Sequence, residues 1–545
     1  METTAVHEFS SLSEWDLWTI PAHAVDKQRV RLNHKGVTMF SIEFFLDALS
    51  PLNLLLCFIG VVAGTIIGAL PGLSATMAVA VLVPLTFSMA PASALIMLGA
   101  IYTGAIYGGS FAAILVNTPG TPSAIATTFD GFPMAKRGDG DLAVTCGTIA
   151  SVVGGVVGAL SLLFLAPLLA EFALRFGPVE YFWLALFGLT LISALSEGSL
   201  LKGWVGAAFG MLCSTVGVAV IGGDLRYTFD SELLLGGIDI VSALIGLYCV
   251  PVLIDLVMTK SRHLDIPKEG KGFHLKEALG LALKDKFNLG RSAVIGTLIG
   301  ILPGAGGSIA SLVAYSEAKR TSSRSANFGK GEPSGVFSTE AANNATVGGG
   351  FIPTLVLGIP GTPPDAVIMG ALLVQGVKTG PSLFSAEGHI VYTFIYGLLL
   401  ATLLMFPVGL FIGKYVYRSI ATFLKSILVP VIAFMCVIGS FAINNNTGDS
   451  LIMVILGGAG WILNRYGFPP SPIVLGIILG PIAEQGFVQS WLIGTAANDI
   501  MGSFFGHPIS QIIIFLIVLV VFYPVFVQKV LRRFDWFKGG QANES

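Results

Sequence analysis

Charged residues are scarce in this sequence. Asp, Glu, Lys and Arg make up 11% of the 545 residues, whereas a soluble domain carries about 25%. No charged residue and no histidine occurs between Ala48 and Phe129, and a spanning helix needs only about 20 apolar residues. The chain therefore lacks the polar surface of a soluble protein, and this stretch alone is long enough to cross a bilayer several times.

Several functional signatures are also missing. The five cysteines stand alone in apolar runs, without the close spacing of zinc sites or disulfide frameworks. No GxxxxGK[ST] phosphate loop, HExxH pair or GxSxG elbow occurs. The formal net charge of −2 and the absence of a long basic run give no reason to expect nucleic acid. We predict that the protein is not an enzyme and has no cofactor, and no metal beyond a coupling sodium ion.

Long apolar segments organise the chain on both sides of a polar break. The candidates are 52–70, 72–89, 92–116, 142–170, 179–196, 203–221 and 238–258, then 292–316, 345–375, 389–413, 426–443, 450–463, 472–483 and 509–528. Backbone groups in lipid must be hydrogen-bonded within their own segment, and the alternating ten-residue segments of barrels are absent. The sequence predicts an all-α polytopic membrane protein with about 12 transmembrane helices.

Charge and composition divide the chain into four parts. Residues 1–38 are polar throughout and lack a continuous apolar core, so we interpret them as a dispensable extension. Residues 39–258 form a first membrane repeat, 259–291 a basic linker with an interfacial amphipathic helix, and 292–545 a second membrane repeat with a short tail. Because positive residues favour the cytoplasm, the linker, Lys319–Arg324 and the tail are predicted to be cytoplasmic.

Two motifs occur once in each half. GTIIGALPG at Gly64–Gly72 matches GTLIGILPG at Gly296–Gly304, an offset of 296 − 64 = 232. PGTP at Pro119–Pro122 matches PGTP at Pro360–Pro363, an offset of 360 − 119 = 241. Two motifs in one order at nearly one offset predict an internal duplication, so that each homologous repeat contains broken or re-entrant helices. The pattern does not decide between parallel and inverted repeats; analogy with other transporters favours inverted ones.

Proline and glycine in these motifs are expected to break the helices. The amides at a half-helix N-terminus attract an anion, and unwound carbonyls can coordinate a cation. Because the motifs contain hydroxyls but no Lys or Arg, we expect amides and hydroxyls to hold substrate carboxylates. The predicted substrate-binding residues are Pro71, Gly72, Ser74, Thr76, Asn117, Thr118, Gly120, Thr121, Gly304, Gly306, Gly307, Ser308, Gly361 and Thr362. Alternatively, these small residues only allow close helix packing. Lys136 and Lys378, which follow the PGTP motifs, are expected at the membrane surface.

Four polar residues near the second-half motifs are candidates for binding the coupling ion. Glu340 and Asp365 can carry a proton or ligate sodium, since an intramembrane carboxylate is costly without a function. Asn343 and Asn344 suit a carbonyl-rich cation site. A helix cap or a structural hydrogen bond would explain the carboxylates equally well.

The segments around these motifs resemble a known family. They are GTIIGALPGLSATMAVAVLVPLTF (64–87), YGGSFAAILVNTPGTPSAIATTFDGFPMAKRGDG (107–140), GTLIGILPGAGGSIASLVAYSEAKR (296–320), EAANNATVGGGFIPTLVLGIPGTPPDA (340–366) and GFPPSPIVLGIILGPIAEQ (467–485). From about Met39 onward, the chain resembles the large membrane subunit of the tripartite tricarboxylate transporters. The resemblance implies a multi-pass permease of the bacterial inner membrane that takes up citrate or other carboxylates by symport with Na⁺ or H⁺.

The same resemblance implies partners. They are a small four-helix membrane subunit, a periplasmic solute-binding protein that delivers the carboxylate substrate, and the lipid bilayer. Whether the protein forms a homo-oligomer is left open.

Two other function classes fit parts of the sequence. Broken helices also line a passive anion channel or an exporter. A membrane-embedded enzyme would need convergent catalytic groups, but His389 and His507 are isolated in the sequence.

Overall fold

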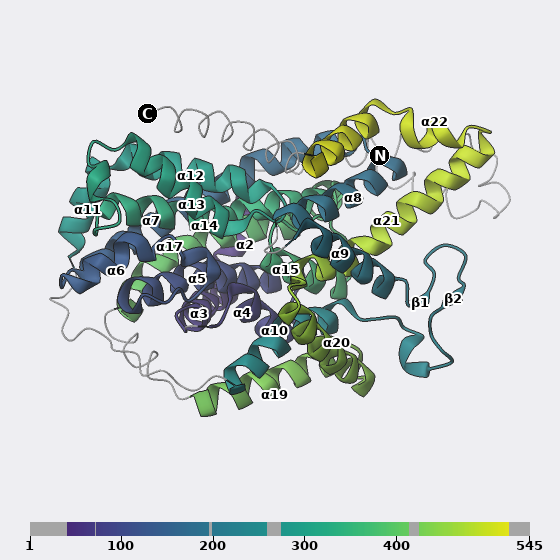
Figure 1. Ribbon diagram of the computed structural model, residues 1–545, viewed down its shortest axis with the longest axis horizontal. Coiled ribbons are helices and arrows are strands. Elements are labelled where there is room, and N and C mark those ends of the chain that lie inside the picture. Colours follow the sequence, from purple (N-terminus) through teal and green to yellow (C-terminus); the bar gives the residue numbers. More distant parts are fainter. Residues whose placement is uncertain (1–40, 71, 196–198, 259–273, 414–424, 523–545) are drawn as a thin grey trace, which may run out of the picture.

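The computed structural model describes residues 41–70, 72–195, 199–258, 274–413 and 425–522. Over these ranges the protein is almost entirely helical (Figure 1), which confirms an all-α polytopic membrane fold. Eight helices are long and apolar enough to cross a membrane, and five apolar helices are shorter. The extension 1–38 and the basic tail lie outside the described residues.

The first half consists of short and long helices with one small hairpin of strands. Its elements are α2 (Ile42–Ala48), α3 (Pro51–Gly68), α4 (Ala75–Leu82), η3 (Val83–Thr86), α5 (Pro91–Val116), η4 (Pro122–Ala124), α6 (Thr128–Lys136), α7 (Gly140–Ala173), α8 (Pro178–Leu195), α9 (Leu200–Ser214), β1 (Gly217–Val218), β2 (Leu225–Arg226), η5 (Glu232–Leu234) and α10 (Ile240–Met258). The predicted apolar run 203–221 is therefore not one helix. Helix α9 ends at Ser214, and Gly217 adopts a φ of 105° at the start of the antiparallel strand pair.

The second half begins with the predicted amphipathic helix. Its elements are α11 (Leu275–Lys284), α12 (Lys286–Ile301), α13 (Gly306–Thr321), η6 (Ser325–Asn327), α14 (Pro333–Leu357), α15 (Pro363–Val374), α16 (Leu383–Ala386), α17 (Gly388–Phe411), α19 (Lys425–Asn444), α20 (Thr447–Arg465), α21 (Pro470–Ala496) and α22 (Ile500–Phe505). The apolar run 345–375 is divided between α14 and α15. The predicted run 472–483 covers only the first half of α21, which continues through Glu484 and Gln485 to Ala496.

Helices α12 and α13 form a re-entrant hairpin. Arg291 near the start of α12 donates a 2.7 Å hydrogen bond to Thr321 at the end of α13. The 16 residues of α12 span about 24 Å, less than the roughly 30 Å of a bilayer core. The turn between the helices contains Gly304, whose φ of 84° favours glycine. The predicted break of this segment at its Pro-Gly motif is thus confirmed.

We call α3 with α4 and α12 with α13 the two hairpins, and the long helix that follows each one, α5 or α14, its crossing helix. Each hairpin packs tightly on its crossing helix. A methyl group on Gly64 of α3 would lie 2.1 Å from the carbonyl oxygen of Ile101 in α5. At the corresponding Gly296 of α12, a methyl group would lie 2.2 Å from the carbonyl oxygen of Ala342 in α14. Only glycine allows these backbones to approach so closely. The matched motifs therefore have matched packing.

The helices that carry matched sequences run in opposite directions. Tyr102 in the middle of α5 packs against Phe351 near the end of α14. Thr127, which follows α5 in the chain, donates a hydrogen bond to Glu340 near the start of α14. Helices α5 and α14 are therefore antiparallel. An inverted orientation of the two whole repeats stays a prediction.

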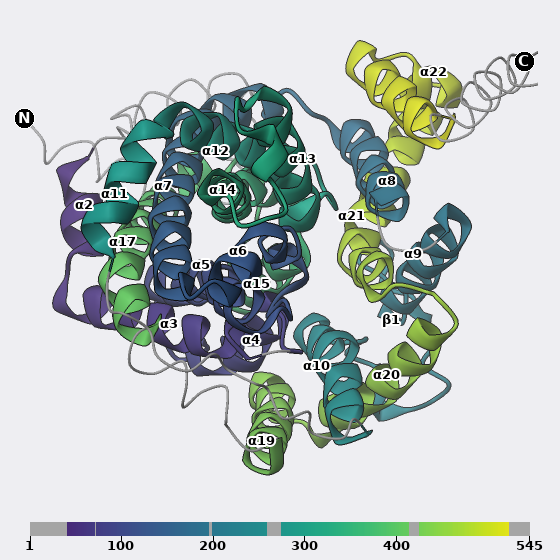
Figure 2. The same cartoon turned by 60° about the vertical axis from the view of Figure 1, so that its left-hand side comes forward.

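The helices form two groups. Figure 2 shows α2 to α7, α11 to α15 and α17 gathered around α14, with α8, α9, α20, α21 and α22 as a separate layer beside them. Helix α10 contacts α4 in the first group and α20 in the layer. We call these two groups the core and the outer layer. The motifs that break the helices all belong to the core.

Candidate functional site

Each PGTP loop folds back onto the hairpin of its own half. The amide of Gly304 donates a 2.8 Å hydrogen bond to the carbonyl of Gly361. In the first half, the amide of Gly120 donates to the carbonyl of Gly109 in α5. Gly120 also lies directly against the carbonyl oxygen of Gly68, where a methyl group would be 2.2 Å away. The loops are therefore held deep in the core by backbone contacts.

The loops also meet the opposite half. Ser123, just after the first PGTP motif, lies against Gly307 at the start of α13. The hydroxyl of Thr362 in the second PGTP motif is 2.8 Å from the hydroxyl of Tyr102 in α5. Both PGTP loops and the α12–α13 hairpin are thus brought together. The tip of the α3–α4 hairpin differs, because Gly72 is exposed and faces Leu256 of α10, and Pro71 lies outside the described residues.

Asp365 is hydrogen-bonded to a hydroxyl group, that of Thr362. Its Oδ2 accepts a 2.6 Å hydrogen bond from Thr362, while Oδ1 has no partner within the described residues. Because the Thr362 proton is donated to Asp365, Tyr102 must donate its own proton to Thr362. All three side chains are buried. A fully buried carboxylate with an unpartnered oxygen is a group suited to holding a proton or a small cation.

Glu340 is also fully buried, and within the described ranges its carboxylate is hydrogen-bonded to hydroxyl groups alone. One oxygen accepts a short hydrogen bond from Thr127, and the other accepts a 3.1 Å bond from Ser151 of α7. These contacts join α14 to the first half of the chain. Neither oxygen of Glu340 pairs with Lys, Arg or His in the described part of the chain.

The two asparagines differ in their bonding. Asn344 donates to the carbonyl and the hydroxyl of Thr103, both at 3.3 Å. Asn343 is fully buried, yet neither its Nδ2 nor its Oδ1 has a hydrogen-bond partner among the described residues. Such a buried amide is costly unless something binds it.

The other predicted residues lie at helix ends, at the surface or in the core. The hydroxyl of Ser74 caps α4 by accepting from the amide of Met77. Asn117 ends α5 with a φ of 54° and, like Thr118, is exposed. Further predicted residues are buried or half-buried in the core, namely Thr76, Gly120, Thr121, Gly304, Gly306, Gly307, Ser308, Gly361 and Thr362. The side chains of Lys136 and Lys378 are exposed.

Sequence reasoning missed Asp130. Its Oδ1 accepts three amide hydrogen bonds from the turn that precedes α14, and its Oδ2 accepts a 2.9 Å bond from Tyr315 of α13. Asp130 therefore connects α6 to the second hairpin and to α14. It is the first charged residue after the charge-free stretch, and that position could have marked it.

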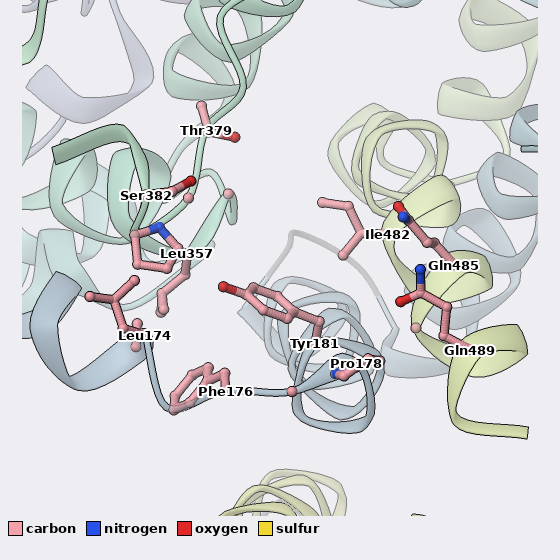
Figure 3. A pocket seen from close by; sticks show the side chains of 16 residues that line it. Leu174, Phe176, Pro178, Tyr181, Leu357, Thr379, Ser382, Ile482, Gln485 and Gln489 are labelled. Carbon is pink, nitrogen blue, oxygen red and sulfur yellow. The ribbon is translucent and has the colours of Figure 1, made fainter. Parts of the chain in front are cut away.

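A pocket of about 450 Å³ lies between the core and the outer layer. Figure 3 shows Leu357, Thr379 and Ser382 on one wall and Gln485 and Gln489 of α21 on the other, with the Tyr181 hydroxyl directed into the space between them. Its lining also includes Gly358, where α14 ends before the second PGTP motif. None of the predicted substrate-binding residues lines this pocket.

Comparisons with known proteins agree with the motif resemblance. A family model described as the tripartite tricarboxylate transporter TctA family matches residues 54–475. An uncharacterized 52.8 kDa protein of the TAR-I ttuC′ 3′ region of Agrobacterium vitis is 36% identical over 456 residues, which cover 82% of this chain and 89% of that protein. A second uncharacterized protein, of the TAR-II ttuC′ 3′ region of the same organism, is 34% identical over 229 residues, which are 41% of this chain and 94% of that protein. No solved structure matches the chain.

Proposed function

Because the chain belongs to the tripartite tricarboxylate transporter TctA family, we propose that it is the permease subunit of a secondary transporter that imports small carboxylates. The single observation that carries this proposal is the meeting of the two PGTP loops with the α12–α13 hairpin inside the core. A broken helix presents amides and a partial positive charge without a cationic side chain, which suits an anionic substrate.

The two buried carboxylates support coupling to a cation. Glu340 and Asp365 lie in the core without a basic partner among the described residues. A charged carboxylate in such a place is unfavourable, and Na⁺ or H⁺ would remove the cost. We therefore propose symport of the carboxylate with Na⁺ or H⁺, citrate being one candidate substrate. No ATP-binding motif contributes to this scheme.

The basic face of the core supports an orientation in the bacterial inner membrane. The pocket at the open end of the α12–α13 hairpin is lined by Lys284, Arg291 and Arg324. Positive residues favour the cytoplasmic side, so this hairpin would enter from the cytoplasm and the pocket of Figure 3 would open towards the periplasm. A periplasmic solute-binding protein would deliver substrate there, and a small four-helix subunit would complete the transporter.

Counterflow in proteoliposomes tests the proposal. The chain is reconstituted with its small membrane subunit, loaded with unlabelled citrate, malate or benzoate, and exposed to the same labelled compound. We expect saturable uptake that depends on Na⁺ or on pH. Flux that does not saturate would show a channel, chemically altered substrate would show an enzyme, and transport only out of the vesicle lumen would show an exporter.

A further inference from the structure

The sequence repeat pairs residues of the two halves, and one such pair differs in its bonding. With the PGTP offset of 241, Tyr102 corresponds to Asn343 because 343 − 102 = 241, and Thr121 corresponds to Thr362 because 362 − 121 = 241. Tyr102 is hydrogen-bonded to Thr362 of the second PGTP loop, and Asn343 lies near Ser123 of the first PGTP loop, since both lie against Gly307. The amide of Asn343, however, has no hydrogen-bond partner among the described residues.

The unpartnered amide lies at a helix N-terminus. Helix α13 is 16 residues long and begins at Gly306 without a side-chain cap. A methyl group on Gly307 would lie 2.4 Å from Oδ1 of Asn343 and 2.8 Å from Cβ of Ser123. The buried Asn343 side chain is thus directed at the first turn of α13. The oxygen and nitrogen of an asparagine amide can be exchanged by rotation, so the side chain can present Nδ2 there.

Hydroxyl groups complete the surroundings. Thr121 and Ser123 are buried and 3.0 Å apart, and because one donates to the other, one hydroxyl proton remains for a ligand. No Lys or Arg occurs in 119–124, 304–308 or 341–346. The amide and hydroxyl groups can donate hydrogen bonds to an anion, and the positive end of the helix dipole favours an anion over a cation at this place.

We propose that Asn343, Ser123 and the N-terminus of α13 form a subsite for one carboxylate group of the substrate, and that Glu340 links its occupancy to the coupling cation. This inference rests on the proposed function. It changes the role of Asn343 from an ion ligand to a substrate contact. The corresponding Tyr102 is already hydrogen-bonded to Thr362, so we assign the subsite to Asn343 alone.

The link to the cation follows from helix geometry. Glu340 and Asn343 are three residues apart on α14, a spacing that puts neighbouring side chains about 5–6 Å apart at Cβ. An anion at Asn343 would therefore be repelled by a charged Glu340. Binding is favourable once a proton or a sodium ion neutralises Glu340. By thermodynamic linkage, the bound carboxylate then raises the affinity for that cation to the same degree.

Replacing Asn343 by aspartate tests whether the site binds an anion or a cation. Asn343→Asp keeps the size of the side chain and adds a negative charge, so we expect the half-saturating substrate concentration in counterflow to rise at least tenfold. Ser123→Ala is a smaller change that should raise it several-fold with no loss of folded protein. Ser242→Ala is the control, because this serine of α10 is as fully buried and lies outside the subsite.

The probe is whichever of citrate, malate and benzoate the wild-type protein exchanges fastest. If Asn343→Asp and Ser123→Ala both keep wild-type affinity, the subsite is refuted. Glu340→Gln retains groups that can bond to Thr127 and Ser151, and we expect it to bind substrate without Na⁺ or low pH. Unchanged cation dependence in this variant would refute the link. If the wild type exchanges none of the three compounds, the proposed function fails instead.

Discussion

Replacing Thr362 by valine should separate the role of its hydroxyl from its shape. The hydroxyl donates 2.6 Å to Asp365 and pairs at 2.8 Å with Tyr102, and all three side chains are buried. A hydrogen bond to a charged group contributes about 1.5–3 kcal/mol and a neutral one about 0.5–1.5 kcal/mol. The substitution should therefore cost about 2–4.5 kcal/mol of folding stability, a large part of the 5–15 kcal/mol typical of proteins.

The matched control is Thr393→Val. Thr393 of α17 is equally buried, but its hydroxyl has no partner among the described residues, so its loss should cost little. Heat denaturation of both purified variants in detergent, followed by circular dichroism, compares their stabilities. Counterflow then compares the cation concentration needed for half-maximal exchange, which should change for Thr362→Val because the Asp365 carboxylate loses the hydrogen bond that Thr362 donates. Equal behaviour of the two variants in both assays would refute this account of Asp365.

Three further predictions concern the rest of the chain. Asp130→Ala should lower the unfolding temperature markedly, because it leaves three amides without an acceptor at a cost of about 1–3 kcal/mol each; unchanged melting in detergent would contradict the role of Asp130. Thr121→Ala should raise the half-saturating substrate concentration roughly tenfold or more, whereas the exposed Lys136→Gln and Lys378→Gln should change it less than twofold; the opposite order in counterflow would favour a lysine clamp. A chain that starts at Met39 should insert and transport like the full chain, as membrane fractionation and uptake measure.

The sequence predicted where helices break because proline and glycine act locally. The positions of Gly304 and Gly361 follow from the motif alone, since each residue determines its own backbone freedom. The direction in which the matched helices run could not be predicted in the same way. A repeated motif has the same sequence whichever way its helix crosses the membrane. Only contacts between residues distant in sequence, such as Tyr102 with Phe351 and Thr127 with Glu340, show that α5 and α14 are antiparallel.

The contacts of the candidate site residues could not be predicted for the same reason. Short polar residues beside the motifs were identified, but their partners depend on packing between the halves. Ser74 and Asn117 are residue types that are common in binding sites. In the structure, Ser74 caps the start of α4 and Asn117 ends α5. Tyr102 was overlooked because an aromatic residue in an apolar helix is usually part of the core, and its hydroxyl partner Thr362 is 260 positions away.

The glycine contacts between hairpins and crossing helices have a mechanical consequence. Where backbones touch at Gly64 and Gly296, there is no layer of side chains that could yield, so a hairpin cannot swing away without breaking its whole contact. Each hairpin and its crossing helix should therefore travel as one body when access alternates. Spin labels on α12 and α14 would then keep a constant separation through the transport cycle, while a pair on α14 and α21 would report any displacement of the core relative to the outer layer.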